Sequence, residues 1–388
     1  MNKFNKILLG FSSVALLAGC SDWLEPATIY VEPENINTPE YYEALRAYKA
    51  SDHTICFGWF SGWNGSGTDM QNQLRGIPDS MDVVSHWNPV ETYVEPLSAA
   101  QIEDLKAVQA KGTKVLFCLF WKNLGFRFTP PEVVEGLKVG TAEYNNAMTN
   151  YWGWYHHGSG GYDKTPEADE AIRRYAQAMT EYVLEQGYDG IDFDYEYHWG
   201  ETGNIVSSPD AIHVLIEELS KNFGPKSGTG RILMVDGEPQ SLNAETGPLI
   251  DYYCIQAYGS PGDMELDNRF AGNGVGQTPS LLAKFGEVES EAEILRKTVW
   301  TETFEGQHKN TGGPKFTTRD GETTYSLMGM AKYYRPSLKD DPTARVGGFG
   351  AYRFDMCRPI NDYFIMRRVI QTVNPSQKQV TDNSEVAQ

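Results

Sequence analysis

The sequence predicts an α/β fold, a single (β/α)8 TIM barrel that follows an N-terminal tether. Apolar segments of strand length alternate with amphipathic segments of helix length, and eight strand segments occur between residues 53 and 354. Repeated βα units with apolar strands form parallel sheets, and eight such units close into a barrel. A doubly wound open sheet is the alternative fold. No GxGxxG motif follows the first strand, which disfavours a dinucleotide-binding version of that alternative.

The expected strands are short apolar runs bounded by Gly, Pro or polar residues. In chain order, they cover residues 53–60, 82–87, 113–121, 189–196, 231–236, 252–258, 298–304 and 346–354. A short helix is expected with Thr38 as its cap and Pro39 in its first turn. Further helices are expected at residues 101–110, 166–186, 211–222, 325–334 and 360–373. The longest begins after the capping residue Thr165, carries apolar residues at helical spacing, and stops at Gly187.

The first 19 residues have the pattern of an export signal. Lys3 and Lys6 precede an apolar run that ends in Leu-Ala-Gly-Cys at residues 17–20. A short basic region, a short apolar region and small residues before a cleavage point are typical of a signal peptide. The ending resembles a bacterial lipobox, which implies cleavage before Cys20 and lipidation of its thiol. The alternative is an ordinary secretory signal with an incidental cysteine.

This interpretation divides the chain into four parts: a signal peptide (1–19), a lipidated tether with a short helix (20–50), the barrel domain (51–373) and a polar tail (374–388). The mature chain would then start Cys20-Ser21-Asp22, which resembles the surface-export signal of Bacteroidota lipoproteins. Together with the lipobox, this resemblance implies a lipoprotein of the bacterial outer membrane that is exposed at the cell surface. Contact with the membrane would be made through the lipid alone. We expect the tethered chain to be a monomer.

The composition excludes some classes of partner. A net charge of −19 without a basic patch argues against binding to nucleic acid or to an anionic membrane surface. Neither a metal-type spacing of Cys and His nor an HExxH motif occurs, so we expect no metal and no other cofactor. Buried free thiols are the first interpretation of the remaining cysteines, and one disulfide is the alternative in an oxidising compartment. These cysteines are Cys56, Cys118, Cys254 and Cys357.

Residues 189–196, Asp-Gly-Ile-Asp-Phe-Asp-Tyr-Glu, carry the strongest functional signal. Along a strand, Asp192, Asp194 and Glu196 share one face, with neighbours ~6.6 Å apart. Burial of three carboxyl groups is costly and like charges this close cannot all ionise, so at least one pKa rises. A carboxylic acid that stays protonated near neutral pH can act as a general acid. A solvated edge strand is the alternative, which the apolar residues between the acids disfavour.

Barrel enzymes place their active sites at the carboxyl ends of the strands. Glu196 is the last of the acids and is expected nearest the rim, with Asp194 and then Asp192 deeper. Gln256 and Tyr258 end the sixth expected strand and share a face. Aromatic residues near other strand ends and in a long loop either stack on a substrate or pack the loops. These are Trp59, Trp87, Trp300, Tyr352 and the aromatic run at residues 151–157.

The acidic strand matches the DGxDxDxE signature at every fixed position, and on this motif the barrel domain resembles glycoside hydrolase family 18. The resemblance implies a retaining, substrate-assisted mechanism, in which the 2-acetamido group of the substrate attacks the anomeric carbon and forms an oxazolinium ion. It implies that Glu196 protonates the leaving oxygen and later activates water. It also implies that Asp194 orients the acetamido group, that Asp192 holds Asp194, and that Tyr258 donates to the acetamido carbonyl.

Departures from the common chitinase pattern resemble the endo-β-N-acetylglucosaminidase branch of this family. Gln256 stands where typical chitinases have Met, and Tyr352 stands where they have the Trp that forms the floor of the −1 sugar site. The SxGG stretch of the third strand is absent, and Gly259 replaces the Asp or Asn that often follows the Tyr. The segment between the seventh and eighth strands is also short for the extra α+β domain of processive chitinases.

We therefore expect an enzyme that hydrolyses the GlcNAc-β-1,4-GlcNAc core bond of N-linked glycans or glycoproteins. A chitinase or chito-oligosaccharide hydrolase is the nearest alternative. A non-catalytic glycan-binding lipoprotein on the same fold is a second alternative, which Glu196 disfavours because such members commonly lack this acid. A carboxylate site for Ca²⁺ or Mg²⁺ is the third.

Overall fold

The computed structural model describes residues 37–67, 70–90, 92–154, 162–199 and 205–376. The predicted signal peptide, the lipidation of Cys20, most of the tether, the end of the aromatic run and most of the polar tail lie outside the described residues.

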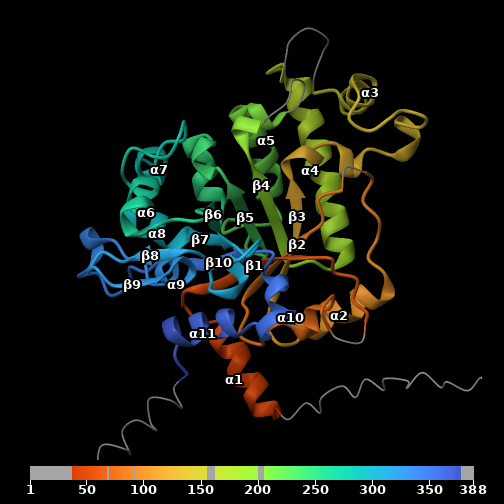
Figure 1. Cartoon of the computed structure of the whole chain (residues 1–388). Coiled ribbons are helices and arrows are strands. Elements are labelled where there is room, and N and C mark those ends of the chain that lie inside the picture. Colours follow the sequence, from red (N-terminus) through yellow and green to blue (C-terminus); the bar gives the residue numbers. More distant parts are fainter. Residues whose placement is uncertain (1–36, 68–69, 91, 155–161, 200–204, 377–388) are drawn as a thin grey trace, which may run out of the picture. The chain divides into compact units, whose positions relative to one another are not determined.

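Eight parallel strands form a closed barrel, in which each strand pairs with the next in the chain and the last pairs with the first (Figure 1). The strands are β1 (Ile55–Ser61), β2 (Val83–Trp87), β3 (Lys114–Phe120), β4 (Gly190–Tyr195), β5 (Ile232–Gly237), β6 (Tyr252–Gln256), β7 (Thr298–Thr303) and β10 (Gly348–Tyr352). Each corresponds to an expected strand, with bounds that differ by no more than a few residues. The predicted (β/α)8 barrel is confirmed.

The predicted helices are also present, and Thr38 and Thr165 cap the first and the longest of them through their side chains. These helices are α1 (Pro39–Lys49), α2 (Ala99–Gln109), α4 (Pro166–Gln186), α5 (Pro209–Leu219), α9 (Ser326–Ala331), α10 (Arg358–Asn361) and α11 (Phe364–Val373). Further elements lie in segments for which no helix or strand was predicted. They are α3 (Ala142–Trp152), α6 (Asp263–Phe270), α7 (Leu281–Phe285), α8 (Glu291–Lys297) and the antiparallel hairpin of β8 (Lys315–Thr317) with β9 (Thr323–Tyr325).

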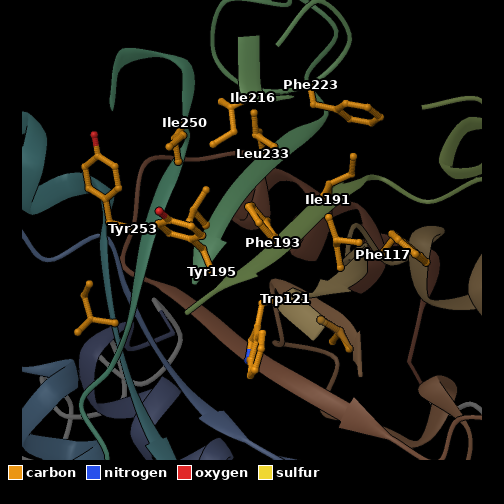
Figure 2. Packing of buried hydrophobic residues seen from close by; sticks show 14 of the residues in the cluster. Phe117, Trp121, Ile191, Phe193, Tyr195, Ile216, Phe223, Leu233, Ile250 and Tyr253 are labelled. Carbon is orange, nitrogen blue, oxygen red and sulfur yellow. The ribbon is translucent and has the colours of Figure 1, made fainter. Parts of the chain in front are cut away.

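Strand β4 has an apolar outer face and an acidic inner face. Ile191, Phe193 and Tyr195 are fully buried in the cluster between the barrel and its helices, and Figure 2 shows them along one strand. Asp192 and Asp194 point the opposite way, into the barrel, because successive side chains of a strand alternate. Apolar side chains from other strands fill the same interior: Phe57, Val83, Leu116, Met234 and Val299. The two acids are therefore enclosed by protein rather than by solvent.

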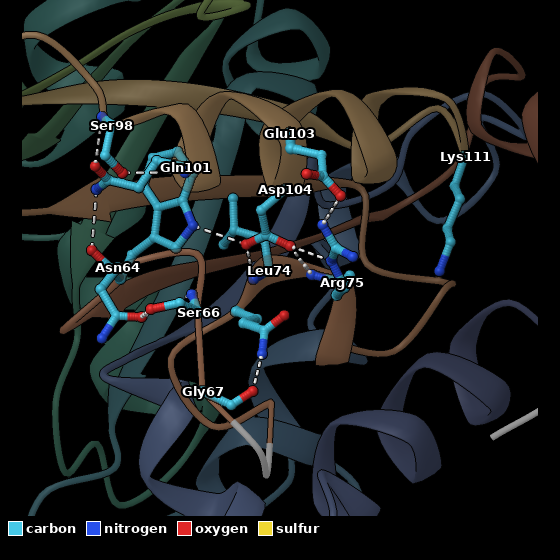
Figure 3. Close-up of polar contacts among 12 residues, drawn as sticks. Asn64, Ser66, Gly67, Leu74, Arg75, Ser98, Gln101, Glu103, Asp104 and Lys111 are labelled. Carbon is cyan, nitrogen blue, oxygen red and sulfur yellow. Dashed lines mark hydrogen bonds and ion pairs between the residues drawn. The ribbon is translucent and has the colours of Figure 1, made fainter. Parts of the chain in front are cut away.

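A buried carboxylate on α2 holds the loop that follows β1. Asp104 is fully buried and accepts hydrogen bonds from the indole of Trp63 (2.8 Å) and from the backbone N–H groups of Leu74 (2.6 Å) and Arg75 (3.0 Å). The Nε of Arg75 adds a fourth bond at 3.0 Å, and Figure 3 shows these contacts converging on Asp104. Because bonds to an ionised acceptor are stronger than neutral ones, Asp104 fastens this loop at the end of a barrel strand.

Asp104→Ala should lower the free energy of unfolding by about 3–5 kcal/mol, because it leaves the indole of Trp63, two backbone N–H groups and the Nε of Arg75 without their buried acceptor. Urea unfolding measures this loss. The matched control is Glu103→Ala, which removes a largely exposed carboxylate that also pairs with Arg75 (3.3 Å). That control should change stability by about 1 kcal/mol or less. Equal stabilities of the two variants would contradict the anchoring role of Asp104.

All four cysteines of the described barrel are free and buried, as the first interpretation predicted. They are Cys56, Cys118, Cys254 and Cys357, and burial raises the pKa of each thiol. None of the helices in the described part of the chain combines the length and the apolar character that crossing a membrane requires.

Candidate active site

A cavity of about 380 Å³ lies at the carboxyl end of the barrel, next to the end of β4. Glu196 directly follows β4 and is partly exposed, Asp194 is 1% exposed, and Asp192 is fully buried below the cavity. This order from rim to interior is the order that the positions of the three acids along the strand predicted. The cavity is lined by Trp59, Trp87, Phe120, Trp121, Lys122, Asp194, Glu196, Gln256, Tyr258 and Tyr352.

The residues at the start of β4 set the position of the strand. Gly190 approaches β5 so closely that a Cβ would lie 2.1 Å from the carbonyl oxygen of Ile232. Asp189 accepts hydrogen bonds from the backbone N–H of Val115 on β3 (3.0 Å) and from the side chain of Gln109 on α2 (2.8 Å). These contacts lie at the end of the strand away from the cavity. The first two residues of the DGxDxDxE motif therefore hold the strand, and the last three carry its acids.

The surroundings of Glu196 favour its protonated form. Burial raises the pKa of its carboxyl group, and the negative charge of Glu238 raises it further. Hydrogen bonds from Trp121 and Gln256 and the charge of Lys122 oppose this rise, but the net direction is upward. A carboxyl group with a raised pKa at the rim of a cavity is suited to give a proton to a bound substrate.

Below the rim, a layer of hydrogen bonds joins the buried acids. The indole Nε1 of Trp59 donates to Oδ2 of Asp192 at 2.9 Å. The amide Nε2 of Gln256 donates to Oδ1 of Asp194 at 3.3 Å and to Oδ1 of Asp236 at 2.9 Å. Burial raises the pKa of Asp192 to about 6, and it raises the pKa of Asp194 and Asp236 well above the usual range. Among the described residues, no group of three or more His, Cys, Asp or Glu side chains is arranged to hold a metal ion.

Asp236 was not predicted as a site residue. It pairs in register with Asp194, so both side chains enter the barrel from neighbouring strands. Asp236 follows the apolar run Ile-Leu-Met-Val at residues 232–235. An acid at the carboxyl end of an apolar barrel strand is the same signal that identified Asp194, so the sequence did carry it.

Of the four aromatic residues predicted to contact substrate, Trp59, Trp87 and Tyr352 lie together at the cavity and Trp300 does not. Trp59, Trp87 and Tyr258 surround Tyr352, with ring centroids 6.1, 5.3 and 6.2 Å from it, and all four line the cavity. Trp59 is only 1% exposed, so its main described contact is the hydrogen bond to Asp192.

The assignment of Trp300 to substrate binding is corrected by the structure. Its neighbour Val299 faces the barrel interior, so Trp300 points outward from β7. It is fully buried there, with its ring 5.5 Å from that of Tyr333. Proximity to a strand end was not sufficient, because the face of the strand decides whether a side chain reaches the cavity.

The end of β3 supplies lining residues that were not predicted. Phe120, Trp121 and Lys122 follow one another at the rim, and the ammonium group of Lys122 lies 5.0 Å from the ring of Trp121. Farther along the same loop, Trp152 and Trp154 are buried, with their rings 5.0 and 5.4 Å from Tyr175 of α4. These two rings therefore pack the loop onto the barrel, which decides between the two interpretations of them.

A buried glutamate holds the backbone beside Tyr258. The N–H of Gly259 donates to both carboxyl oxygens of Glu302 at 3.0 and 3.1 Å, and the hydroxyl of Ser326 bonds to the same carboxylate. Gly259 has a φ of +73°, a conformation that glycine adopts without strain. The residue after Tyr258 thus contributes a backbone donor rather than a polar side chain.

Comparisons with known proteins identify relatives of this chain. The family described as glycoside hydrolase family 18, BT1044-like, matches residues 19–372. Endo-beta-N-acetylglucosaminidase F2 of Elizabethkingia meningoseptica is 29% identical over 235 residues, which are 55% of this chain and 54% of that protein. The match therefore spans about half the length of this curated relative.

Two solved structures share the fold. A BT1044 variant in selenomethionine form is 29% identical, with a TM-score of 0.67, and the match covers 89% of this chain and 96% of the other. An endo-beta-N-acetylglucosaminidase of Cordyceps militaris is 20% identical, with a TM-score of 0.54, and the match covers 87% and 97% of the two chains. Since the family match extends over the whole barrel and includes the acidic strand, the chain belongs to glycoside hydrolase family 18.

Proposed function

We propose that this glycosidase is an endo-β-N-acetylglucosaminidase that hydrolyses the GlcNAc-β-1,4-GlcNAc bond in the core of N-linked glycans. The observation that carries the proposal is the cavity, in which Glu196 and Asp194 are the lining acids and Tyr352 lies between three aromatic side chains. The activity named for the Elizabethkingia relative supports it. A structure of the Cordyceps enzyme with fucosyl-N-acetylglucosamine-Asn shows a ligand of the glycan class that we propose for this cavity.

The mechanism that we propose uses the substrate's own acetamido group in place of an enzyme nucleophile. The acetamido carbonyl oxygen attacks the anomeric carbon while Glu196 gives its proton to the leaving oxygen. Asp194 accepts a hydrogen bond from the acetamido N–H and stabilises the oxazolinium charge, and Tyr258 donates to the acetamido oxygen. Glu196 then takes a proton from the water that opens the oxazolinium ring. Tyr352 supports the sugar from below.

Two features favour N-glycans over chitin as the substrate. Tyr352 and Gln256 occupy positions where chitinases commonly have Trp and Met. The segment between β7 and β10 holds the hairpin β8–β9 and helix α9 in its described structure, rather than a separate α+β domain. A cleft without that domain is suited to a branched glycan on a protein better than to a long linear polymer.

Mass spectrometry of an N-glycoprotein panel after treatment with residues 21–388 tests this function, with Glu196→Gln as the inactive control and chito-oligosaccharides in parallel. A protein that keeps one N-acetylglucosamine while the rest of the glycan is released would support the proposal. Cleavage of chito-oligosaccharides alone would overturn it in favour of a chitinase. Glycan binding without cleavage of either substrate would overturn it in favour of a lectin.

Trp59→Phe should lower kcat by about tenfold with little change in KM, because one hydrogen bond of roughly 1.5 kcal/mol to a buried carboxyl group is lost. The hydrogen bond from Trp59 lowers the pKa of Asp192, so its loss should raise that pKa. Steady-state kinetics on a released core glycan measures the effect. A large rise in KM at unchanged kcat would contradict this result and would indicate that Trp59 contacts the sugar.

We also propose that the enzyme is attached to the outer membrane through a lipid on Cys20 and faces the cell exterior. The support is the basic and apolar leader that ends in Leu-Ala-Gly-Cys at residues 17–20. Metabolic labelling with a fatty acid in a bacterial host, compared between wild type and Cys20→Ser, tests the attachment. Label that persists in Cys20→Ser would overturn it. Protease treatment of intact cells tests the orientation, and full protection of the barrel would contradict surface exposure.

A further inference from the structure

Arg127 is a buried cation that has no carboxylate partner among the described residues. It lies in the helical turn Phe126–Phe128 and is 3% exposed. Its Nη1 donates to the carbonyl of Asn88 at 2.7 Å, and its guanidinium lies 5.6 Å from the ring of Phe117. No ion pair in the described part of the chain involves it, and its buried Nε reaches no acceptor there. Since a buried arginine is rarely left unpaired, this one lacks its usual counter-ion.

A cavity of about 160 Å³ lies beside this guanidinium, on the outer side of the barrel wall. Phe117, which lines it, belongs to the same outer cluster as Ile191 (Figure 2). His86 of β2 lines it too, whereas the next residue, Trp87, lines the active-site cavity. The two cavities share no lining residue, so this one is a separate site at the back of the active-site wall.

The other titratable groups that line this outer cavity do not neutralise Arg127. Nδ1 of His86 and the hydroxyl of Tyr188 are hydrogen-bonded at 2.8 Å. Burial, followed by the charge of Arg127, lowers the pKa of His86 to about 3, and burial raises the pKa of Tyr182 to about 12 and that of Tyr188 well above its usual range. These three groups are therefore uncharged near neutral pH. Glu95 lines the cavity at its exposed side and makes no described ion pair with Arg127.

The charge and shape of these groups favour one kind of anion. Burial lowers the pKa of Arg127, but a guanidinium stays charged near neutral pH, and its planar N–H groups match the two oxygens of a carboxylate. One positive charge balances one negative charge. Because the carboxylate of Glu95 is also close, a doubly charged phosphate or sulfate would leave excess negative charge in the site.

We propose that the outer cavity binds a small monocarboxylate of about the size of acetate, which is the missing counter-ion of Arg127. The bound carboxylate would help to hold the segment after β2, whose Val94 already donates its N–H to the carbonyl of Arg127 at 2.7 Å. This site is separate from the reaction, so the proposal does not depend on the proposed function.

Isothermal titration calorimetry with sodium acetate tests the site, with protein dialysed into a carboxylate-free buffer and ionic strength held constant. We expect wild type to bind one acetate, and Arg127→Met to raise Kd by at least about tenfold, because a charge-assisted hydrogen bond is lost. The matched control is Arg173→Met on α4, which removes an arginine that already pairs with Glu217 (2.7 Å) and Glu218 (3.3 Å). It should keep the wild-type Kd. No acetate binding by wild type, or an equal Kd in Arg127→Met, would overturn the proposal.

Thermal unfolding gives a second readout. For a Kd of about 1 mM, 100 mM acetate should raise the Tm of wild type by about 4 °C more than that of Arg127→Met. Sodium sulfate at the same ionic strength should produce no such difference, and a larger difference with sulfate would overturn the assignment to a carboxylate.

Glu91, which follows the lining residue Val90 in sequence and lies outside the described residues, provides a further test. The proposal expects Glu91→Gln to bind acetate as wild type does. Acetate binding that appears in Glu91→Gln and is absent from wild type would assign the counter-ion to the chain itself and would overturn the proposal.

Discussion

Glu196→Gln should fold as wild type does and lose kcat by about 10⁴-fold, because an amide cannot give a proton to the leaving oxygen. The loss should appear in kcat with little change in KM, since the side chains keep the same shape and the cavity wall is preserved. Rates measured on a released core glycan, with circular dichroism as the check on folding, give this result. Residual activity above about 1% of wild type would contradict the role of Glu196 as the acid.

A matched control for this variant is Glu238→Gln on the neighbouring strand end. Glu238 accepts hydrogen bonds from the backbone N–H of His198 (3.2 Å) and pairs with its ring Nδ1 (2.8 Å), and it does not line the cavity. Its negative charge raises the pKa of Glu196, so its removal should lower that pKa. Activity requires protonated Glu196, and the alkaline limb of the pH–rate profile should therefore move to lower pH while the maximal rate is largely kept. An unchanged alkaline limb would indicate that another group sets it.

The barrel was predictable because each of its strands is marked by a physical pattern within the strand itself. The alternation in residues 189–196 placed three acids on one face and three apolar side chains on the other, and the structure shows β4 with these two faces. Thr165 and Gly187 likewise marked the ends of α4, where they cap the helix. Helices α6 to α8 could not be identified in this way, because they are short and are stabilised by packing on the barrel rather than by a long amphipathic repeat.

A site residue could be predicted only where two conditions hold. The residue lies near the carboxyl end of a strand, and its side chain points into the barrel. Gln256 and Tyr352 satisfied both conditions and line the cavity. Trp300 satisfied the first condition and not the second, so it lies in the outer core. Asp236 satisfied both, but a single acid after an apolar run is a weaker signal than three acids at alternate positions. Trp121 was not identified because its place at the rim depends on the turn that follows β3.

Asp194→Asn should change activity and stability in opposite directions. Its kcat should fall by about 10²- to 10³-fold, because the acetamido N–H and the oxazolinium ion lose their charged partner. Its stability should rise relative to wild type as the pH increases. Asp194 is buried, and burial followed by the negative charge of Glu196 raises its pKa in the folded state. A carboxyl group with a raised folded-state pKa contributes its full stability below its unfolded pKa of about 4. This contribution is lost as the pH rises from there through the folded-state pKa, because the unfolded chain releases the proton first.

Wild type should therefore lose stability relative to Asp194→Asn as the pH rises above about 4, by up to about 1.4 kcal/mol for each unit of pKa shift, until the folded-state pKa is passed. Urea unfolding of both proteins at several pH values measures this difference. A structural role for Asp194 predicts the reverse, namely a variant that is less stable at every pH and loses activity because it unfolds. Higher stability of Asp194→Asn together with lost turnover would indicate that the ionised carboxylate of Asp194 destabilises the fold and is needed for the reaction.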